Sequence, residues 1–303
     1  MVSSVAERDT PPASGLTSGK LALHHDGLSR PLEAPRLRVL SLGAGVQSTT
    51  LLLMSERGDL DRLDAAIFAD TGNEKRRVYR HLDWLETQTS IPIVRRARPG
   101  ATLGEYMDQV ANGERTFRGS AAVVPLYLAR PDGVLPKQCN AEFKRDVVTR
   151  EVAALLGGAP RDGVSAVEMW LGMSRELREL ERVGRNRRRY IHNRYPLIEA
   201  RMTRRDCERW LAERQYPAAP KSACIYCPFR PNDQWQEMKE AEPEDFADAV
   251  AFDARWRGIT PKGVGQAYVH RSRQPLGEID FTKDDDPNDL FGFANDCEGS
   301  CGT

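Results

Sequence analysis

Six cysteines are the residues of this 303-residue chain whose types and spacing most directly predict chemistry. Two of them form a Cys-x-x-Cys pair, Cys224 and Cys227, in a proline-rich stretch between Pro217 and Pro231. This spacing lets two thiolates face one metal, but zinc needs four ligands, and the sequence has no second such pair and no nearby pair of histidines. Cys139, just before a predicted helix, is the third candidate. Three thiolates would hold three corners of a 4Fe–4S cluster and leave one iron open.

Other arrangements of the same cysteines stay open at this point. Cys224 and Cys227 can be half of a structural zinc site that Cys297 and Cys301 complete, or they can form a reversible disulfide. Cys139 alone can be an inert buried thiol, which is a common fate of single cysteines.

A glycine-containing loop is the second candidate site. Residues 41–48 read SLGAGVQS and join a predicted strand to a predicted helix. Glycines let the backbone approach a phosphate, a helix N-terminus supplies free N–H groups, and Ser41 and Ser48 add hydroxyl donors. The Walker and dinucleotide fingerprints do not fit, because the Gly-Lys-Ser/Thr ending and the third glycine are absent. The alternative is a tight turn without a ligand.

Strands and helices that alternate along the first half of the chain must position these loops. The pattern predicts strands at residues 36–42, 65–69, 91–94 and 167–172, and helices at 49–58 and around 78–85. This alternation implies a parallel sheet covered on both faces, with ligands beyond the carboxyl ends of its strands. The turn DTGNE at 70–74 falls at that same edge. Further on, helices are predicted from Thr203 to about Tyr216, with Cys207 in its core, and from Gln234 to Trp256.

Three segments, taken in order, resemble the PP-loop ATP pyrophosphatases of the adenine nucleotide alpha-hydrolase-like superfamily, and most closely its phosphoadenosine phosphosulfate reductase-like branch. They are SLGAGVQS at 41–48, FADTGNE at 68–74 and KSACIYCPF at 221–229, within about residues 36–230. The resemblance implies a doubly wound parallel α/β sheet of the PP-loop (HUP-like) type. We expect a flexible tail at 1–35, this nucleotide-binding domain at 36–200, a smaller, mostly helical subdomain at 201–280 and an acidic tail at 281–303.

The resemblance also implies a nucleotide site for ATP and Mg²⁺. The expected contacts are Ser41, Gly43, Gly45, Gln47, Ser48, Asp70, Thr71 and Arg182. The loop departs from the usual Ser-Gly-Gly-x-Asp-Ser pattern, because Gly43 replaces the first serine and Gln47 the aspartate. For Asp70, simple turn chemistry is the alternative.

Iron–sulfur sulfur transferases of this superfamily are similar in their three cysteines, which implies that Cys139, Cys224 and Cys227 bind a 4Fe–4S cluster. Adenylation makes a substrate oxygen into a leaving group, and iron-bound hydrosulfide is a strong nucleophile. We therefore expect an ATP-dependent sulfur transferase with catalytic roles for Cys139 and Cys301. Its acceptor would be tRNA, DNA or a small molecule, and its sulfur would come from a cysteine desulfurase or sulfide.

Two rival functions keep the fold. One is a reductase of a sulfonucleotide, in which the tail thiol of Cys301 is the nucleophile. The other is a non-catalytic nucleotide- or zinc-binding partner of a modification system. Cys301 can also shuttle sulfur or supply the fourth cluster ligand, and a homodimer is compatible with each of these functions.

Charge and composition limit the class of protein. The 44 basic and 44 acidic residues cancel, but arginines crowd residues 182–194 and acids crowd the C-terminal tail, so a polyanionic substrate stays open. The arginines with Tyr190, His192 and Tyr195 suit phosphate contact and base stacking, or they form a solvated, ion-paired loop. Lys144 can meet a phosphate or lie on the surface. A hydrophobic fraction of 40% excludes a wholly disordered chain, and no segment suits a membrane or a signal peptide, so we expect a cytoplasmic protein.

Overall fold

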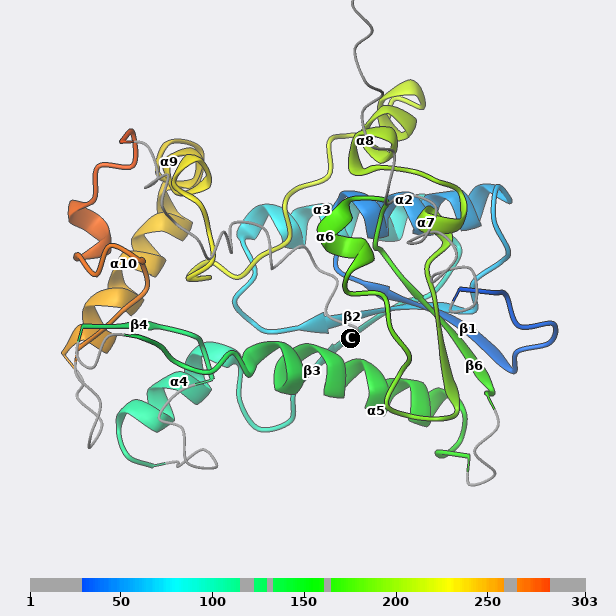
Figure 1. Ribbon diagram of the computed structural model, residues 1–303, viewed down its shortest axis with the longest axis horizontal. Coiled ribbons are helices and arrows are strands. Elements are labelled where there is room, and N and C mark those ends of the chain that lie inside the picture. Colours follow the sequence, from blue (N-terminus) through cyan, green and yellow to red (C-terminus); the bar gives the residue numbers. More distant parts are fainter. Residues whose placement is uncertain (1–28, 115–122, 130–132, 161–164, 259–265, 284–303) are drawn as a thin grey trace, which may run out of the picture.

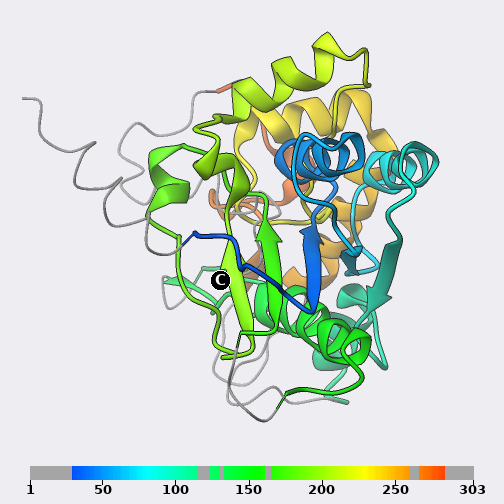
Figure 2. The ribbon, with the colours of Figure 1, turned by 90° about the vertical axis from the view of Figure 1, so that its right-hand side faces the viewer.

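A five-stranded parallel sheet forms the centre of the computed structural model, which describes residues 29–114, 123–129, 133–160, 165–258 and 266–283. The strands are β1 (Leu37–Leu42), β2 (Ala65–Asp70), β3 (Ile93–Ala97), β6 (Val167–Leu171) and β7 (Ile191–Arg194). Their order is β3-β2-β1-β6-β7, and Figure 2 shows them side by side with β3 and β7 at opposite edges. From β1 the chain adds β2 and β3 on one side, and later β6 and β7 on the other side. The order of strands therefore reverses between β1 and β6, and ligands of such sheets bind at this switch point.

Helices cover both faces of the sheet, which confirms the predicted α/β architecture (Figure 1). One face carries α2 (Val46–Arg57), α3 (Arg76–Gln88) and α8 (Arg204–Glu213), and the other carries α5 (Asp146–Leu155). Successive side chains of a strand point to opposite faces, so Leu40 and Leu42 of β1 pack in the α2 core and Val39 packs in the α5 core. The short helices α6 (Leu177–Leu180) and α7 (Pro196–Glu199) flank β7.

Most predicted helix ends agree with the structure. Gly58 ends α2 in the left-handed conformation, with a φ of 82°. Thr203 and Asp206 form the predicted capping box of α8. The single helix predicted from Gln234 to Trp256 is wrong, because Pro243 begins a new helix. The structure has α9 (Asn232–Ala241) and α10 (Pro243–Arg257) instead.

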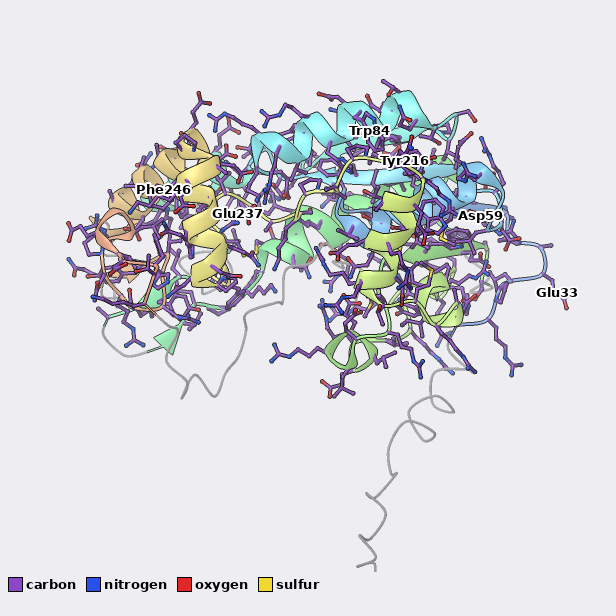
Figure 3. The ribbon with its side chains drawn as sticks, turned by 90° about the horizontal axis from the view of Figure 1, so that it is seen from above. Glu33, Asp59, Trp84, Tyr216, Glu237 and Phe246 are labelled. Carbon is purple, nitrogen blue, oxygen red and sulfur yellow. The ribbon has the colours of Figure 1, made fainter. Side chains whose placement is uncertain are left out.

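A second, smaller unit lies at one end of the molecule. Its core contains Tyr106, Trp235, Phe252 and Trp256. It combines α9, α10, α4 (Leu103–Ala111), the short helix η2 (Leu276–Glu278) and a small sheet of β5 (Gly133–Val134), β4 (Tyr127–Leu128) and β8 (Ala267–Tyr268). The packing differs from the predicted division at residue 200, because α4 joins this unit whereas α8 packs against α2. Figure 3 shows Glu237 and Phe246 of this unit far from Asp59 and Glu33.

Ion pairs between the start of α3 and the helices of the smaller unit connect the two units, and we call this contact the joint. Lys75 Nζ lies 3.2 Å from Glu242 Oε2, and Arg77 Nε lies 2.6 Å from Glu242 Oε1. Arg76 pairs with Asp245. Lys75 is only 1% exposed, so this contact is an interior one. Within the described ranges, no helix has both the length and the apolar character needed to cross a membrane.

Candidate functional site

The glycine loop between β1 and α2 is a tightly organised turn. Ala44 adopts a φ of 55°, which is uncommon for a residue with a side chain. The backbone N–H of Gly43 donates to Ser48 Oγ at 3.2 Å, and that hydroxyl lies 3.3 Å from the carbonyl oxygen of Gly45. Gly45 caps α2 without a side-chain hydrogen bond. The first turn of α2 therefore has backbone donors suited to an anion.

Two distant segments approach this loop closely. A Cβ atom added at Gly172, just after β6, would lie 3.0 Å from the backbone nitrogen of Ser48, so a side chain there would collide. One added at Gly45 would lie 3.6 Å from Ser222 Cβ. Ser222 is 3% exposed, and its Oγ has no hydrogen-bond partner among the residues that the structure describes. Gly172 ends a predicted strand and Ser222 belongs to the KSACIYCPF segment, but only the fold brings both residues to the loop.

Three of the residues predicted to bind the nucleotide lie around the loop rather than at its tip. Gln47 is 3% exposed, and its amide donates to Ser174 Oγ at 3.3 Å and to Glu179 Oε1 at 3.0 Å. It thereby connects α2 to the segment after β6. Ser41 lies within β1, between β2 and β6. Arg182 follows α6 and is half-buried, and its backbone N–H donates to the Glu179 carbonyl at 3.0 Å.

Asp70 and Thr71 end β2 but face different neighbours. Asp70 Oδ1 accepts the backbone N–H of Gly72 at 2.8 Å and the hydroxyl of Tyr79 at 2.7 Å, so the turn chemistry is present. Burial and the Asp70 carboxylate raise the pKa of Tyr79. Thr71 is 1% exposed, and its Oγ1 lies 3.6 Å from Cys224 Sγ. Thr71 therefore belongs to the cysteine side of the site.

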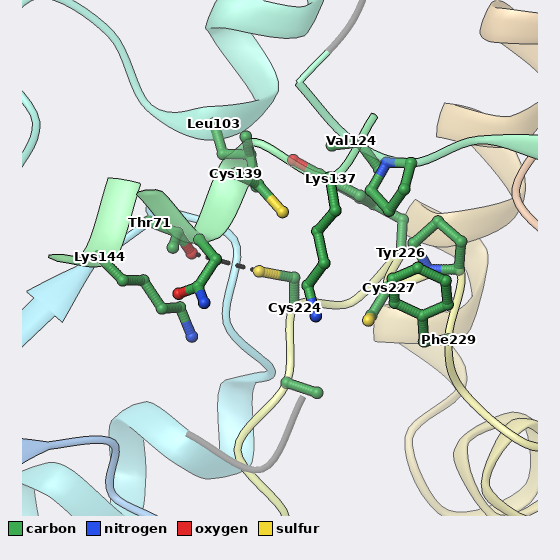
Figure 4. Close-up of a pocket in the computed structure, with 14 residues that line it drawn as sticks. Thr71, Leu103, Val124, Lys137, Cys139, Lys144, Cys224, Tyr226, Cys227 and Phe229 are labelled. Atoms are coloured by element: carbon green, nitrogen blue, oxygen red, sulfur yellow. Dashed lines mark hydrogen bonds between the residues drawn. The ribbon is translucent and has the colours of Figure 1, made fainter. Parts of the chain in front are cut away.

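Cys139, Cys224 and Cys227 line one pocket, although they come from segments more than 80 residues apart. The pocket encloses about 500 Å³, including its open side, and Figure 4 shows the three sulfur atoms around the same space. Cys139 precedes a short π-helix, η1 (Ala141–Arg145), which leads into α5, and the other two lie between α8 and α9. No disulfide joins these three cysteines to one another. The three cysteines named from the sequence therefore line the same pocket.

A buried carboxylate stands behind the pocket. Glu74 and Cys224 form an isolated antiparallel bridge, which fixes the turn after β2 against the Cys-x-x-Cys segment. The side chain of Glu74 is fully buried, and its Oε1 lies 2.9 Å from Lys144 Nζ and 3.8 Å from Cys224 Sγ. Its Oε2 has no hydrogen-bond partner within the described ranges. In the sequence, Glu74 is only the last residue of the predicted turn at 70–74. Its position just after a predicted strand was the signal that it could belong to the site.

Positive charge surrounds the pocket. Lys137 and Lys144 line it, and the buried guanidinium of Arg230 donates to the carbonyl oxygen of Cys224 at 2.8 Å. Burial and the nearby Glu74 raise the pKa of the Cys224 thiol, and Lys144 opposes this change. Cys224 is therefore a neutral thiol at physiological pH in the metal-free protein, so a metal must displace its proton on binding.

The donor set fits a soft metal or an iron–sulfur cluster, because three thiols converge and the surrounding cations favour an anionic occupant. Two residues that line the pocket, Tyr226 and Asn140, each have a buried side-chain oxygen without a hydrogen-bond partner in the described part of the chain. In the described ranges, no three His, Cys, Asp or Glu side chains are already spaced to hold one metal ion. The three thiols must therefore move closer together to share one. Cys297 and Cys301 lie outside the described residues.

Two other expectations concern residues away from the pocket. Cys207 is fully buried in the α2 core, as predicted, and burial raises the pKa of its thiol to about 12. Tyr190 and Tyr195 are 7% and 0% exposed, so they are not available to stack on bases. The base-stacking interpretation of these two tyrosines is therefore wrong, because their rings complete the α5 core.

Comparison with known proteins gives no family for this chain. No protein-family profile matches it, and no curated protein matches it significantly. Function must therefore be inferred from the site.

Proposed function

We propose that this chain is an ATP-dependent sulfur transferase of the PP-loop type. It would adenylate an oxygen of its substrate, releasing pyrophosphate, and sulfur would then displace that oxygen together with AMP. The observation that carries the proposal is the pocket lined by Cys139, Cys224 and Cys227. The segment that contains Cys224 and Cys227 also lies against the glycine loop, through Ser222.

The glycine loop supplies the nucleotide side of this proposal. The N–H groups at the start of α2 would bind phosphate oxygens, with Ser48 and the unpartnered hydroxyl of Ser222 as further donors. Asp70 keeps one carboxylate oxygen without a described hydrogen bond, and this oxygen would face Mg²⁺ or the nucleotide. The loop also lies at the switch point of the sheet, where nucleotides bind in doubly wound folds.

The thiols supply the sulfur side. Cys139, Cys224 and Cys227 would hold a 4Fe–4S cluster, with zinc as the alternative. When bound, such a cluster supplies an open iron that can present sulfur to the substrate. Lys137 and Lys144 would balance the negative charge of the thiolates and of an adenylated substrate.

Thr71 and Ser222 connect the two sides. Thr71 ends β2 and contacts Cys224, and Ser222 lies two residues before Cys224 and against Gly45. A substrate adenylated at the loop would therefore lie next to the thiols without a large movement of the protein, which is the advantage of proximity.

Anaerobic reconstitution of the full-length protein with iron and sulfide tests the cysteine side. We expect a brown protein with absorbance near about 400 nm, as iron–sulfur centres show. Replacing Cys139, Cys224 or Cys227 by serine should abolish this absorbance. Cys207→Ala is the matched control, because Cys207 lies in the α2 core. A colourless protein that binds one zinc would contradict the proposal.

Release of pyrophosphate and AMP from ATP tests the nucleotide side. We expect Ser222→Ala to weaken ATP binding about tenfold or more, because a hydrogen bond to a charged group contributes about 1.5–3 kcal/mol. Ser165→Ala, a surface change, is the control. Turnover that needs Cys301 but no metal would instead indicate the sulfonucleotide reductase.

A further inference from the structure

Exposed arginines between residues 175 and 205 make no ion pair with any residue that the structure describes. They are Arg175, Arg185, Arg187, Arg188, Arg189, Arg201 and Arg205. This segment holds eleven arginines but only four acidic residues. Of those acids, Glu179 accepts hydrogen bonds from Ser174, and Glu199 pairs with Arg194. The nearby carboxylates thus leave much of the positive charge uncompensated.

Arg185, Arg187, Arg188 and Arg189 lie in the loop that leads into β7, at the edge of the sheet, whereas Arg175 follows β6 and Arg205 lies in the first turn of α8. At one end, the backbone N–H of Arg175 donates to Met202 at 2.9 Å, just beyond the carboxyl end of β6. At the other end, the carbonyl oxygen of Arg189 accepts Ser165 Oγ at 3.5 Å, before β6 begins. The five residues of β6 between these ends span about 17 Å at 3.3 Å per residue. We call this band of arginines the β7 stripe.

The stripe is fixed to the sheet rather than loosely attached. The amide of Asn186 donates to Asn193 Oδ1 at 3.0 Å, and the hydroxyl of Tyr195 donates to the Gly184 carbonyl at 2.8 Å. Both Asn193 and Tyr195 are buried. These bonds hold the backbone of the loop before β7 in one path.

The length and chemistry of the stripe define its partner. A single phosphate needs one or two arginines, whereas a row of about 17 Å can reach several phosphates along one backbone. Binding of single strands depends largely on exposed aromatic rings that stack on bases. Tyr190 and Tyr195 of this segment are buried, and the half-buried ring of His192 is held by the Arg30 carbonyl oxygen at 2.8 Å, so phosphate contact is the main chemistry that remains.

We propose that the β7 stripe binds the phosphate backbone of a double-stranded nucleic acid. One end of the stripe reaches the carboxyl edge of the sheet, where the glycine loop lies. If the nucleic acid is the sulfur acceptor, this inference rests on the proposed sulfur transfer. The acceptor is then a base-paired nucleic acid rather than a small metabolite.

Binding of labelled nucleic acids to the full-length protein tests this proposal. The probes are a short DNA duplex, an RNA duplex of the same sequence and the corresponding single strands. Arg187→Gln/Arg188→Gln should weaken duplex binding at least about tenfold and reduce the salt dependence of log K by about 1.8, since each phosphate contact contributes about 0.9. Arg80→Gln/Arg150→Gln is the control, because it removes the same charge from exposed sites on α3 and α5.

Equal losses in the two variants would overturn the proposal, as would tighter binding of single strands or no binding of either duplex. Loss confined to the stripe variant supports it, and the DNA and RNA duplexes distinguish the two sources. This measurement needs neither ATP nor metal. A Cys224→Ser protein should bind duplexes normally, so failure of cluster assembly and failure of nucleic-acid binding are separate results.

Discussion

Arginines at the joint and arginines of the β7 stripe are the same side chain in opposite electrostatic surroundings. Arg76 lies 3.0 Å from Asp248 and also contacts Asp245, and Arg77 lies 2.7 Å from Glu237. Arg187 and the other named stripe arginines have no such partner in the described part of the chain. The chain thus provides carboxylates where arginines hold its own units together. At the β7 stripe, where the arginines face solvent, the described part of the chain places no carboxylate against them. This pattern is expected of a surface that binds an external anion.

The joint also bears on the cysteine pocket. Leu103 and Val124, which line the pocket, belong to the smaller unit, and Cys139 packs against its core, whereas Thr71 follows β2 of the larger unit. Ion pairs at the joint therefore keep two walls of the pocket together. Within the described ranges, the stripe arginines make no such contact between the units. We therefore expect mutation of the joint to lower stability, and mutation of the stripe to leave stability nearly unchanged.

The largest effect is expected from breaking the interior of the joint. Lys75→Met should lower the free energy of unfolding by about 3–5 kcal/mol, because removing one partner of a buried ion pair leaves the other charge uncompensated. Urea unfolding measures this. A loss below about 1 kcal/mol would mean that Arg77 alone neutralises Glu242, and the joint would then be weaker than its burial indicates.

A smaller loss in the free energy of unfolding is expected when the pH is lowered. Burial lowers the pKa of His81 and of His270 to about 4, from an ordinary value of 6.5. Below pH 6.5 the unfolded chain takes up these protons while the folded chain does not, so stability falls as the pH drops toward 4. Between pH 7 and pH 5 we expect a loss of about 2 kcal/mol per histidine.

His81→Gln tests the acid effect on its own. His81 lies on α3, where its Nε2 is 3.0 Å from Thr49 Oγ1, and glutamine can keep a hydrogen bond there without titrating. The loss of stability between pH 7 and pH 5 should be about half that of the unmodified protein. An unchanged loss would show that acid acts through other groups.

The smallest effect is expected at the β7 stripe. Arg187→Gln/Arg188→Gln should change the free energy of unfolding by less than about 0.5 kcal/mol, because exposed side chains without partners contribute little to stability. Urea unfolding beside Lys75→Met gives the direct contrast. A loss comparable to that of Lys75→Met would show that these arginines hold the fold, and the comparison between the two regions would fail.

Local patterns predicted the elements near the site well. The apolar run before Gly43 forms β1, and the segment after Gly45 forms α2. The prediction was weakest where sequence-distant contacts decide. Glu74 was predicted only as part of a turn, yet it contacts Cys224 and Lys144 because β2 ends beside the Cys-x-x-Cys segment.

The arginine-rich segment is a second case in which contacts between distant segments could not be predicted from the sequence. Its composition predicted phosphate contact or an ion-paired loop, and it placed tyrosines among the arginines as stacking partners. Tyr195 instead packs in the α5 core, because β7 pairs with β6 and turns that side chain inward. Only the sheet register determines which neighbours of an arginine face solvent.

The sequence by itself determined the alternation of strands and helices, the glycine loop at the end of β1 and the three cysteines as a group. These features depend on residue type, periodicity and short-range spacing. Only the tertiary structure decided that the thiols share a pocket with Glu74 and Lys144, that Ser222 lies against the loop, and which arginines lack partners. The reason is physical: burial, charge compensation and side-chain proximity arise between segments that are far apart in the chain, and packing brings those segments together.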